Sequence, residues 1–274
     1  MKFIQKLAAI QKKNNSLLCI GLDTDTAKIP AHLRGASNPQ LEFNRHIIES
    51  TSDLVCAYKL NLAFYESAGT QCYETVRRTL ELIPPEIVTI GDGKRGDIGN
   101  TAEHYVKILF GDWKFDAATV NPYMGKDSVD PFLQSDEHGI FLLALTSNRG
   151  AKDFQYLPCG GKPLYEHVVR CAKKWNTKNN IGLVVGATHP RELQRIRSIA
   201  REMPLLIPGV GAQQGDLVKT VRYGCTKRGD LAIVNVSRGI IYASGENDFG
   251  RVSRTAAQTY RDQMNVIRRK YFMK

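Results

Sequence analysis

Paired charges of opposite sign concentrate in the segment D-G-K-R-G-D, which begins at Asp92. Asp92 and Lys94 are two residues apart, so on an extended strand both side chains point to the same side. Lys59 lies near the end of another apolar run and can reach the same place if the two strands are neighbours. Carboxylates beside a buried lysine keep it protonated near neutral pH, although desolvation alone would lower its pKa. Such a lysine can act as a general acid, and the alternative is a purely structural network of ion pairs.

A second group of residues is suited to binding an anion such as a phosphate. Gly209, Gly211 and Gly215 in P-G-V-G-A-Q-Q-G allow backbone N–H groups to approach an anion closely, and a helix is expected to follow. Gln213 can add an amide donor, and Arg238 can add a guanidinium with several parallel donors. The glycines alone would fit ordinary turns, but together with Arg238 they predict a phosphate site.

These residues follow short apolar runs that alternate with longer amphipathic stretches. The runs are near-continuous, which is typical of parallel strands buried on both faces. Eight such runs, each followed by a helix, predict an α/β fold, a (β/α)8 TIM barrel, with residues 1–274 as a single domain. A doubly wound open sheet is disfavoured because the first run ends in I-G-L-D-T-D, without a G-x-G-x-x-G segment. The predicted strands are Leu17–Asp23, Leu54–Asn61, Ile87–Lys94, Ala117–Asn121, Ile140–Thr146, Ile181–Ala187, Pro204–Val210 and Leu231–Val236.

Amphipathic segments predict the helices that surround the barrel. At the N-terminus, Phe3, Leu7 and Ile10 share one face at helical spacing, and this helix is expected to close one end of the domain. The last helix is expected over Arg251–Lys274, and its basic C-terminal end suits the helix dipole. Other helices are predicted at Leu41–Ser52, Ala102–Phe110, Tyr165–Trp175 and Arg191–Glu202.

The active site of a TIM barrel lies at the carboxyl ends of the strands. Asp23 ends the first predicted strand and Ser147 follows the fifth, so both are candidate site residues. The longest irregular segment, Ser147–Pro163, begins at the same place and contains Gly150, Gly160 and Gly161 as flexible points. Because long loops in compact domains tend to be functional, this segment is predicted to be a lid.

The net charge of +11 favours anionic partners, which include nucleic acids, acidic lipids and phosphorylated metabolites. The alternative is a solvated basic surface. The basic residues are spread over many helices and do not form a stripe interleaved with aromatic residues, so nucleic acid is disfavoured as a partner. No apolar run approaches the length of a membrane span, and the N-terminus lacks the long apolar region of a signal peptide.

The six cysteines contain no C-x-x-C pair, and two of them, Cys19 and Cys56, lie inside apolar runs. This usage indicates free thiols in a reducing compartment, and a cytoplasmic location is expected. The six histidines have neither metal-ligand spacing nor an obvious nucleophile nearby, so no metal site is predicted.

The segment D-G-K-R-G-D-I-G-N-T, Asp92–Thr101, resembles the D-x-K-x-x-D-I signature of orotidine 5′-monophosphate decarboxylases. The resemblance extends in order along nearly the whole chain through G-L-D, Y-K-L-N, T-S-N, P-G-V-G-A-Q and the arginine of N-V-S-R-G. The segment Thr119–Gly125 and the chain length resemble the longer bacterial branch of that family. The D-x-K-x-x-D core alone is less specific, since related sugar-phosphate enzymes share it.

The resemblance implies a role for each matching residue. Lys59, Asp92 and Lys94 would form the charged network, with Asp97 supplied by the other subunit of a homodimer with shared active sites. The implied ligands of the substrate are Asp23 and, across the dimer interface, Thr101 for the ribose; Ser147 for the pyrimidine; and Gln213, Arg238, Gly209 and Gly211 for the phosphate.

The implied reaction is decarboxylation of orotidine 5′-monophosphate to UMP without a metal or organic cofactor. Repulsion between the substrate carboxylate and the Asp92 and Asp97 carboxylates would be relieved as CO2 leaves, and Lys94 would protonate C6. The closest alternative is a Mg²⁺-dependent 3-keto sugar-phosphate decarboxylase or hexulose-phosphate synthase of the same superfamily. Lys59, Ser147 and Arg238 argue against that alternative.

Overall fold

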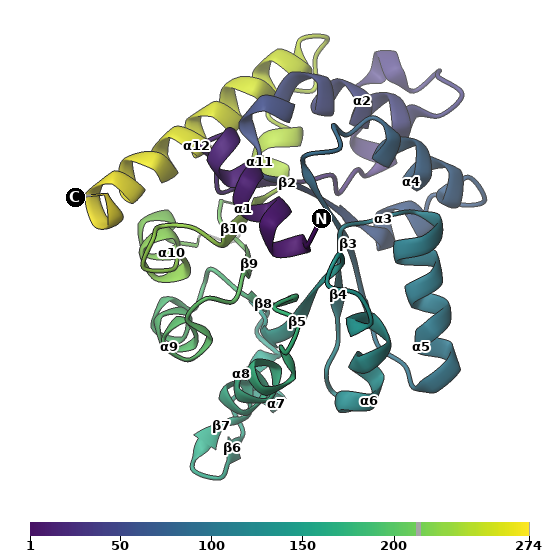
Figure 1. Ribbon diagram of the computed structural model, residues 1–274. Coiled ribbons are helices and arrows are strands. Elements are labelled where there is room, and N and C mark those ends of the chain that lie inside the picture. The colour runs from purple at the N-terminus through teal and green to yellow at the C-terminus, as the bar shows by residue number, and fades with distance from the viewer. Residues whose placement is uncertain (212–214, 274) are drawn as a thin grey trace.

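The computed structural model describes residues 1–211 and 215–273. Among them, eight parallel strands form a closed barrel in the order β1-β10-β9-β8-β5-β4-β3-β2, with helices around the outside (Figure 1). The predicted α/β TIM barrel is confirmed. The barrel strands are β1 Leu18–Gly21, β2 Ala57–Asn61, β3 Val88–Arg95, β4 Ala117–Val120, β5 Gly139–Leu145, β8 Ile181–Val185, β9 Leu205–Pro208 and β10 Ala232–Val236.

The helices lie close to the segments predicted from amphipathic spacing. The helix expected at Ala102–Phe110 differs most, because it begins at Gly99 and passes at Lys107 into a π-helix that ends at Asp112. The α-helices are α1 Phe3–Lys13, α2 Pro39–Thr51, α3 Leu62–Glu66, α4 Cys72–Glu81, α5 Gly99–Val106, α6 Lys126–Val129, α7 Ala151–Phe154, α8 Leu164–Trp175, α9 Pro190–Ala200, α10 Leu217–Gly224, α11 Arg238–Ile241 and α12 Phe249–Phe272. Short 3-10 helices span Thr26–Lys28, Ala31–Leu33, Ser52–Leu54 and Asp130–Leu133.

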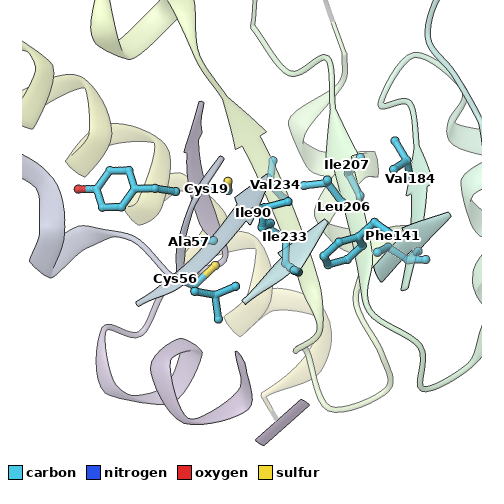
Figure 2. Packing of buried hydrophobic residues seen from close by; sticks show 14 of the residues in the cluster. Cys19, Cys56, Ala57, Ile90, Phe141, Val184, Leu206, Ile207, Ile233 and Val234 are labelled. Atoms are coloured by element: carbon cyan, nitrogen blue, oxygen red, sulfur yellow. The ribbon is translucent and has the colours of Figure 1, made fainter. Parts of the chain in front are cut away.

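The core fills the barrel and the layer between the strands and the helices. Figure 2 shows part of it, with Cys19, Ile90, Phe141 and Val234 contributed by four different strands. All four residues are fully buried. Burial on both faces of the strands explains why their sequences are continuous apolar runs rather than alternating ones.

The pairing of β3 with β4 is irregular at the carboxyl end of the barrel. Gly91 pairs with Ala118, but the next pair is Arg95 with Val120. Three residues of β3, 92–94, therefore lie opposite Thr119 alone. Such a bulge re-aims side chains and is frequent beside active sites.

Helix α1 closes the opposite end of the barrel, as predicted, and lies across it in Figure 1. The fully buried Phe3 ring contacts Phe141 edge-on, with 6.0 Å between ring centroids. A Cβ at Gly139 would lie 2.4 Å from the Phe3 ring, so this glycine makes room for it. The buried Gln11 side chain accepts from Leu231 N at 2.9 Å and donates to Ala232 O at 2.8 Å, which ties α1 to the start of β10.

The prediction that Ser147–Pro163 is irregular is wrong, and its role as a lid stays a prediction. The segment contains α7 and an antiparallel hairpin formed by β6, Pro158–Cys159, and β7, Lys162–Pro163, which projects from the barrel in Figure 1. Gly160 and Gly161 form its turn with φ of +57° and +77°, so they supply the left-handed backbone of a tight hairpin rather than flexible points.

The six cysteines are free. Within the described part of the chain, no helix is both long and apolar enough to cross a membrane.

Replacing Phe3 by alanine tests the role of α1 as the closure of the barrel. We expect Phe3→Ala to lower the free energy of unfolding by about 3–5 kcal/mol, because a buried ring is lost and a cavity remains. Urea denaturation measures the change. A change below about 1 kcal/mol, the scale of surface substitutions, would contradict this role.

Candidate active site

The strand ends surround a cavity of about 420 Å³. Its position at the carboxyl end of the barrel is where the active sites of this fold lie. Its polar lining residues are Asp23, Lys59, Asn61, Asp92, Lys94, Thr119, Thr146, Ser147, Asn148, Asn235, Ser237 and Arg238. Its remaining lining residues are Leu143, Val184, Leu206, Pro208, Gly209, Val210 and Gly239.

Four charged side chains form an alternating row along one wall of this cavity. Lys59 Nζ lies 3.2 Å from Asp23 Oδ1 and 2.9 Å from Asp92 Oδ2. Lys94 Nζ lies 2.8 Å from Asp92 Oδ1. The row therefore runs from Asp23 through Lys59 and Asp92 to Lys94, and Asp92 is shared by both lysines. The proximity that strand spacing predicted for Lys59, Asp92 and Lys94 is confirmed.

The row sets the charge state of its buried members. Burial alone would lower the pKa of Lys59, but the carboxylates of Asp23 and Asp92 outweigh burial and raise this pKa above its usual value. Burial alone would raise the pKa of Asp92, but Lys59 and Lys94 outweigh it and hold this pKa well below the usual carboxyl range. Lys59 is therefore an ammonium and Asp92 a carboxylate at neutral pH.

Lys94 differs from the expectation of a buried lysine. Its side chain is 47% exposed, compared with 4% for Lys59, because Lys94 stands at the rim of the cavity while Lys59 lies within the wall. Its backbone has φ of +48°, a left-handed conformation that is uncommon for residues other than glycine. The bulge of β3 is what places it in this conformation, with its ammonium turned back to Asp92.

The structure describes most of the residues that were predicted to bind phosphate. Arg238, at the start of α11, and Gly209, after β9, both line the cavity. Gly209 has φ of +104°, a backbone conformation in which a residue with a side chain would be strained. Gly211, with φ of +84°, follows in the same loop but does not line the cavity as described, and Gln213 lies outside the described residues. A Cβ at Gly215 would lie 2.7 Å from Gly209 O, so that glycine keeps the loop closed.

Ser147 lines the cavity just beyond β5, as predicted. The neighbouring Thr146 is held from outside by Gln155, which accepts from Thr146 N at 2.8 Å and donates to Thr146 Oγ1 at 2.8 Å. A Cβ at Gly186, after β8, would lie 2.9 Å from the Ser147 backbone. The position of Ser147 therefore depends on the Gln155 amide and on the absence of a side chain at residue 186.

Asp97 and Thr101 are not brought to this cavity. Neither lines it in the part of the chain that the structure describes, and Thr101 is exposed on α5. The Asp97 carboxylate accepts from the following backbone N–H, that of Ile98, at 2.8 Å. A role for these two residues requires them to face the cavity of another subunit.

Thr119 and Asn235 line the cavity but were not predicted as site residues. Thr119 is the polar residue of the otherwise apolar run Ala117–Val120, and Asn235 is likewise alone within β10. A polar residue inside a buried strand was the available signal in both cases.

Within residues 1–211 and 215–273, no group of three His, Cys, Asp or Glu side chains is arranged to hold a metal ion. His189 Nε2 lies 3.1 Å from the carbonyl oxygen of Thr146, one of the residues that line the cavity.

A parallel barrel with paired charges at its carboxyl end defines a TIM-barrel enzyme, and comparison with known proteins narrows this class. Residues 16–248 match the orotidine 5′-phosphate decarboxylase / HUMPS family. The chain is 47% identical over 275 residues to orotidine 5′-phosphate decarboxylase of Dehalococcoides mccartyi, covering 99% of this chain and 100% of that protein. It is 46% identical over 271 residues to the enzyme of the same name from Ralstonia nicotianae, covering 98% and 100% of the two chains.

A solved structure gives the same result. The OMP decarboxylase of Leishmania donovani superposes with a TM-score of 0.86 at 34% identity, covering 98% of this chain and 99% of that one. The chain belongs to the orotidine 5′-phosphate decarboxylase / HUMPS family. The resemblance seen in the sequence, including that to the longer bacterial branch, is thereby confirmed.

Removal of Lys59 tests whether the row depends on its shared cation. We expect Lys59→Met to lower the free energy of unfolding by about 3–5 kcal/mol at pH 7, because two partly buried carboxylates lose their common partner. Arg254→Met is the control, since its pair with Asp53 is largely exposed and its loss should cost less than about 1 kcal/mol.

The difference between Lys59→Met and wild type should shrink in acid. The depressed pKa of Asp92 gives wild type a stabilisation that is present above the usual carboxyl pKa of about 4 and lost as the pH falls. The raised pKa of Lys59 also gives a stabilisation of the folded state. This stabilisation is present at all pH values below the usual lysine pKa and is lost only in strong base. Urea denaturation at pH 7 and at about pH 3, below the usual carboxyl pKa, measures the difference. An equal loss at both pH values would contradict the coupling of Lys59 to Asp92.

Proposed function

We propose that Lys94 donates the proton in the reaction of this family member, with Asp92 and Lys59 fixing its position and charge. The reaction is decarboxylation of orotidine 5′-phosphate to UMP, a step of pyrimidine biosynthesis, and the enzyme is a carboxy-lyase. The observation that carries the proposal is the alternating row, in which Asp92 holds Lys94 Nζ at 2.8 Å on the open side of the cavity.

The residues that line the cavity suit the phosphate, the ribose and the pyrimidine of this substrate. Arg238 and the backbone of the Gly209 loop offer donors to the phosphate, and the Asp23 carboxylate can accept hydrogen bonds from ribose hydroxyls. Ser147 can bond the pyrimidine from the end of β5. Gln213 and Gly211 would add to the phosphate site. Contacts remote from the reacting carbon supply binding energy that orients the base against Lys94.

In the proposed chemical step Lys94 is the proton donor. The bond between C6 and the carboxylate breaks, CO2 leaves, and the electron pair remains on C6. The Lys94 ammonium stabilises this negative charge and transfers a proton to C6, which gives UMP, and the neutral amine then takes a proton from water. Asp92 lies beside the substrate carboxylate in this arrangement, so loss of CO2 also relieves a repulsion between like charges.

A Mg²⁺-dependent sugar-phosphate reaction is the alternative within the same family. A metal-dependent enzyme would need free carboxylate oxygens facing the substrate. Here Asp23 and Asp92 are both paired with Lys59, and Asp92 is also paired with Lys94. The pairing favours decarboxylation by a lysine acid, and treatment with EDTA separates the two reactions.

Purified enzyme should decarboxylate orotidine 5′-phosphate in the presence of EDTA, followed as the absorbance change of the pyrimidine. We expect Lys94→Ala to lower kcat by about 10²- to 10⁴-fold, the range for loss of a general acid. Lys126→Ala is the matched control, because its ammonium pairs with Asp130 on the surface and should leave kcat unchanged. Loss of wild-type activity in EDTA, restored by Mg²⁺, would favour the sugar-phosphate alternative.

We also propose that two copies of the chain form a homodimer with shared active sites. Asp97 and Thr101 match the family's site residues but do not line their own cavity, so they would act in the cavity of the second copy. The surface beside them is apolar: Ile98 is 57% exposed and Tyr123 80% exposed. Exposed apolar groups of this size, next to unused site residues, fit a surface that is covered by a second copy.

Mixing two inactive variants tests the shared site. Lys94→Ala and Asp97→Ala chains, unfolded together and refolded, should regain about a quarter of wild-type activity, because half of the dimers are mixed and each has one intact site. Each variant refolded alone is the control. No recovery in mixed dimers isolated by two different affinity tags would contradict the shared site.

The cytoplasmic location and the single catalytic domain over residues 1–274 stay predictions.

A further inference from the structure

We infer that the Thr119 hydroxyl is a positioning group that fixes Lys94 and Asp92 relative to each other. The inference rests on the proposed roles of these two residues in catalysis. Thr119 is 1% exposed and lies on β4, opposite the bulge formed by residues 92–94 of β3.

The bulge leaves the Lys94 N–H without a place in the strand ladder, and Thr119 supplies the missing partner. Lys94 N donates to Thr119 Oγ1 at 2.9 Å. This bond holds a backbone whose φ of +48° costs free energy for a residue with a side chain. Without it, β3 would lose the contact that favours the left-handed conformation at Lys94.

The same oxygen acts on the carboxylate that orients the lysine. Thr119 Oγ1 donates to Asp92 Oδ1 at 2.8 Å, and Lys94 Nζ donates to that same Oδ1 at 2.8 Å. One hydroxyl therefore joins the backbone of Lys94 to the acceptor of its ammonium. Because threonine is branched at Cβ and stiff at χ1, the hydroxyl has little freedom to leave this geometry.

The other end of the same strand pair contains a matched arrangement without a role in the reaction. Thr89 Oγ1 accepts from Asp116 N at 3.0 Å and donates to Asp116 Oδ2 at 3.0 Å, while Lys6 Nζ pairs with Asp116 Oδ1. Thr89 is also buried. A substitution there removes the same kinds of bonds at a distance from the cavity, so it separates positioning from general stability.

The test compares Thr119→Val, Thr119→Ser and Thr89→Val by steady-state kinetics and urea denaturation. Thr119→Val keeps the shape of the side chain and removes both bonds, so we expect kcat to fall about 10- to 100-fold, the equivalent of one bond to a charged group. KM should change less than about threefold, since phosphate and ribose contacts are untouched. Thr119→Ser should retain most of kcat, and Thr89→Val should lose stability without losing kcat.

Several outcomes would overturn the inference: a Thr119→Val enzyme with kcat within about twofold of wild type, a serine variant as impaired as the valine variant, or an equal loss of kcat in Thr89→Val. Thr119→Ala, which cannot clash with its neighbours, serves in place of valine if that variant does not fold. Failure of wild type to decarboxylate orotidine 5′-phosphate would instead overturn the proposed function, so the two failures are distinguishable.

Discussion

The ammonium of Lys59 is tolerated inside the barrel wall because the carboxylates of Asp23 and Asp92 face it, and the geometry of the site follows from that pairing. An unpaired charge at this depth would be neutralised or would destabilise the fold. Asp92 must in turn stay ionised, which it does because it has two lysine partners. The second of these partners, Lys94, is thereby held at the rim of the cavity, where a substrate can meet it.

The barrel places the site residues by bringing the carboxyl ends of separate strands together. It also departs from regular strand pairing between β3 and β4. A regular β3 would give Lys94 an extended backbone, whereas the bulge gives it the left-handed φ of +48°. The bulge opposite Thr119 exchanges ladder hydrogen bonds for bonds to a side chain. Regular structure therefore supplies the scaffold, while the irregular residues set the orientation of Lys94.

Much of the fold and of the charged row could be predicted from the sequence, because burial on both faces leaves a continuous apolar run and two-residue spacing fixes a common side. The exposure of Lys94 and the part played by Thr119 depend on the register with β4, which no spacing within one strand reveals. Gly160 and Gly161 carried a hairpin signal, but the flanking residues, which include Pro158 and Pro163, do not resemble strands. The positions of Asp97 and Thr101 cannot follow from one chain if their partners belong to another.

The contact of Gln11 with the start of β10 has a consequence for the synthesis of the chain. Gln11 is synthesised early, yet its side chain bonds the backbone of Leu231 and Ala232, which are made more than two hundred residues later. Helix α1 therefore lacks these hydrogen-bond partners until β10 has been made, and the barrel can close only when β10 is in place. Contacts between such distant parts of the sequence slow folding, so closure of the barrel is a late step of folding.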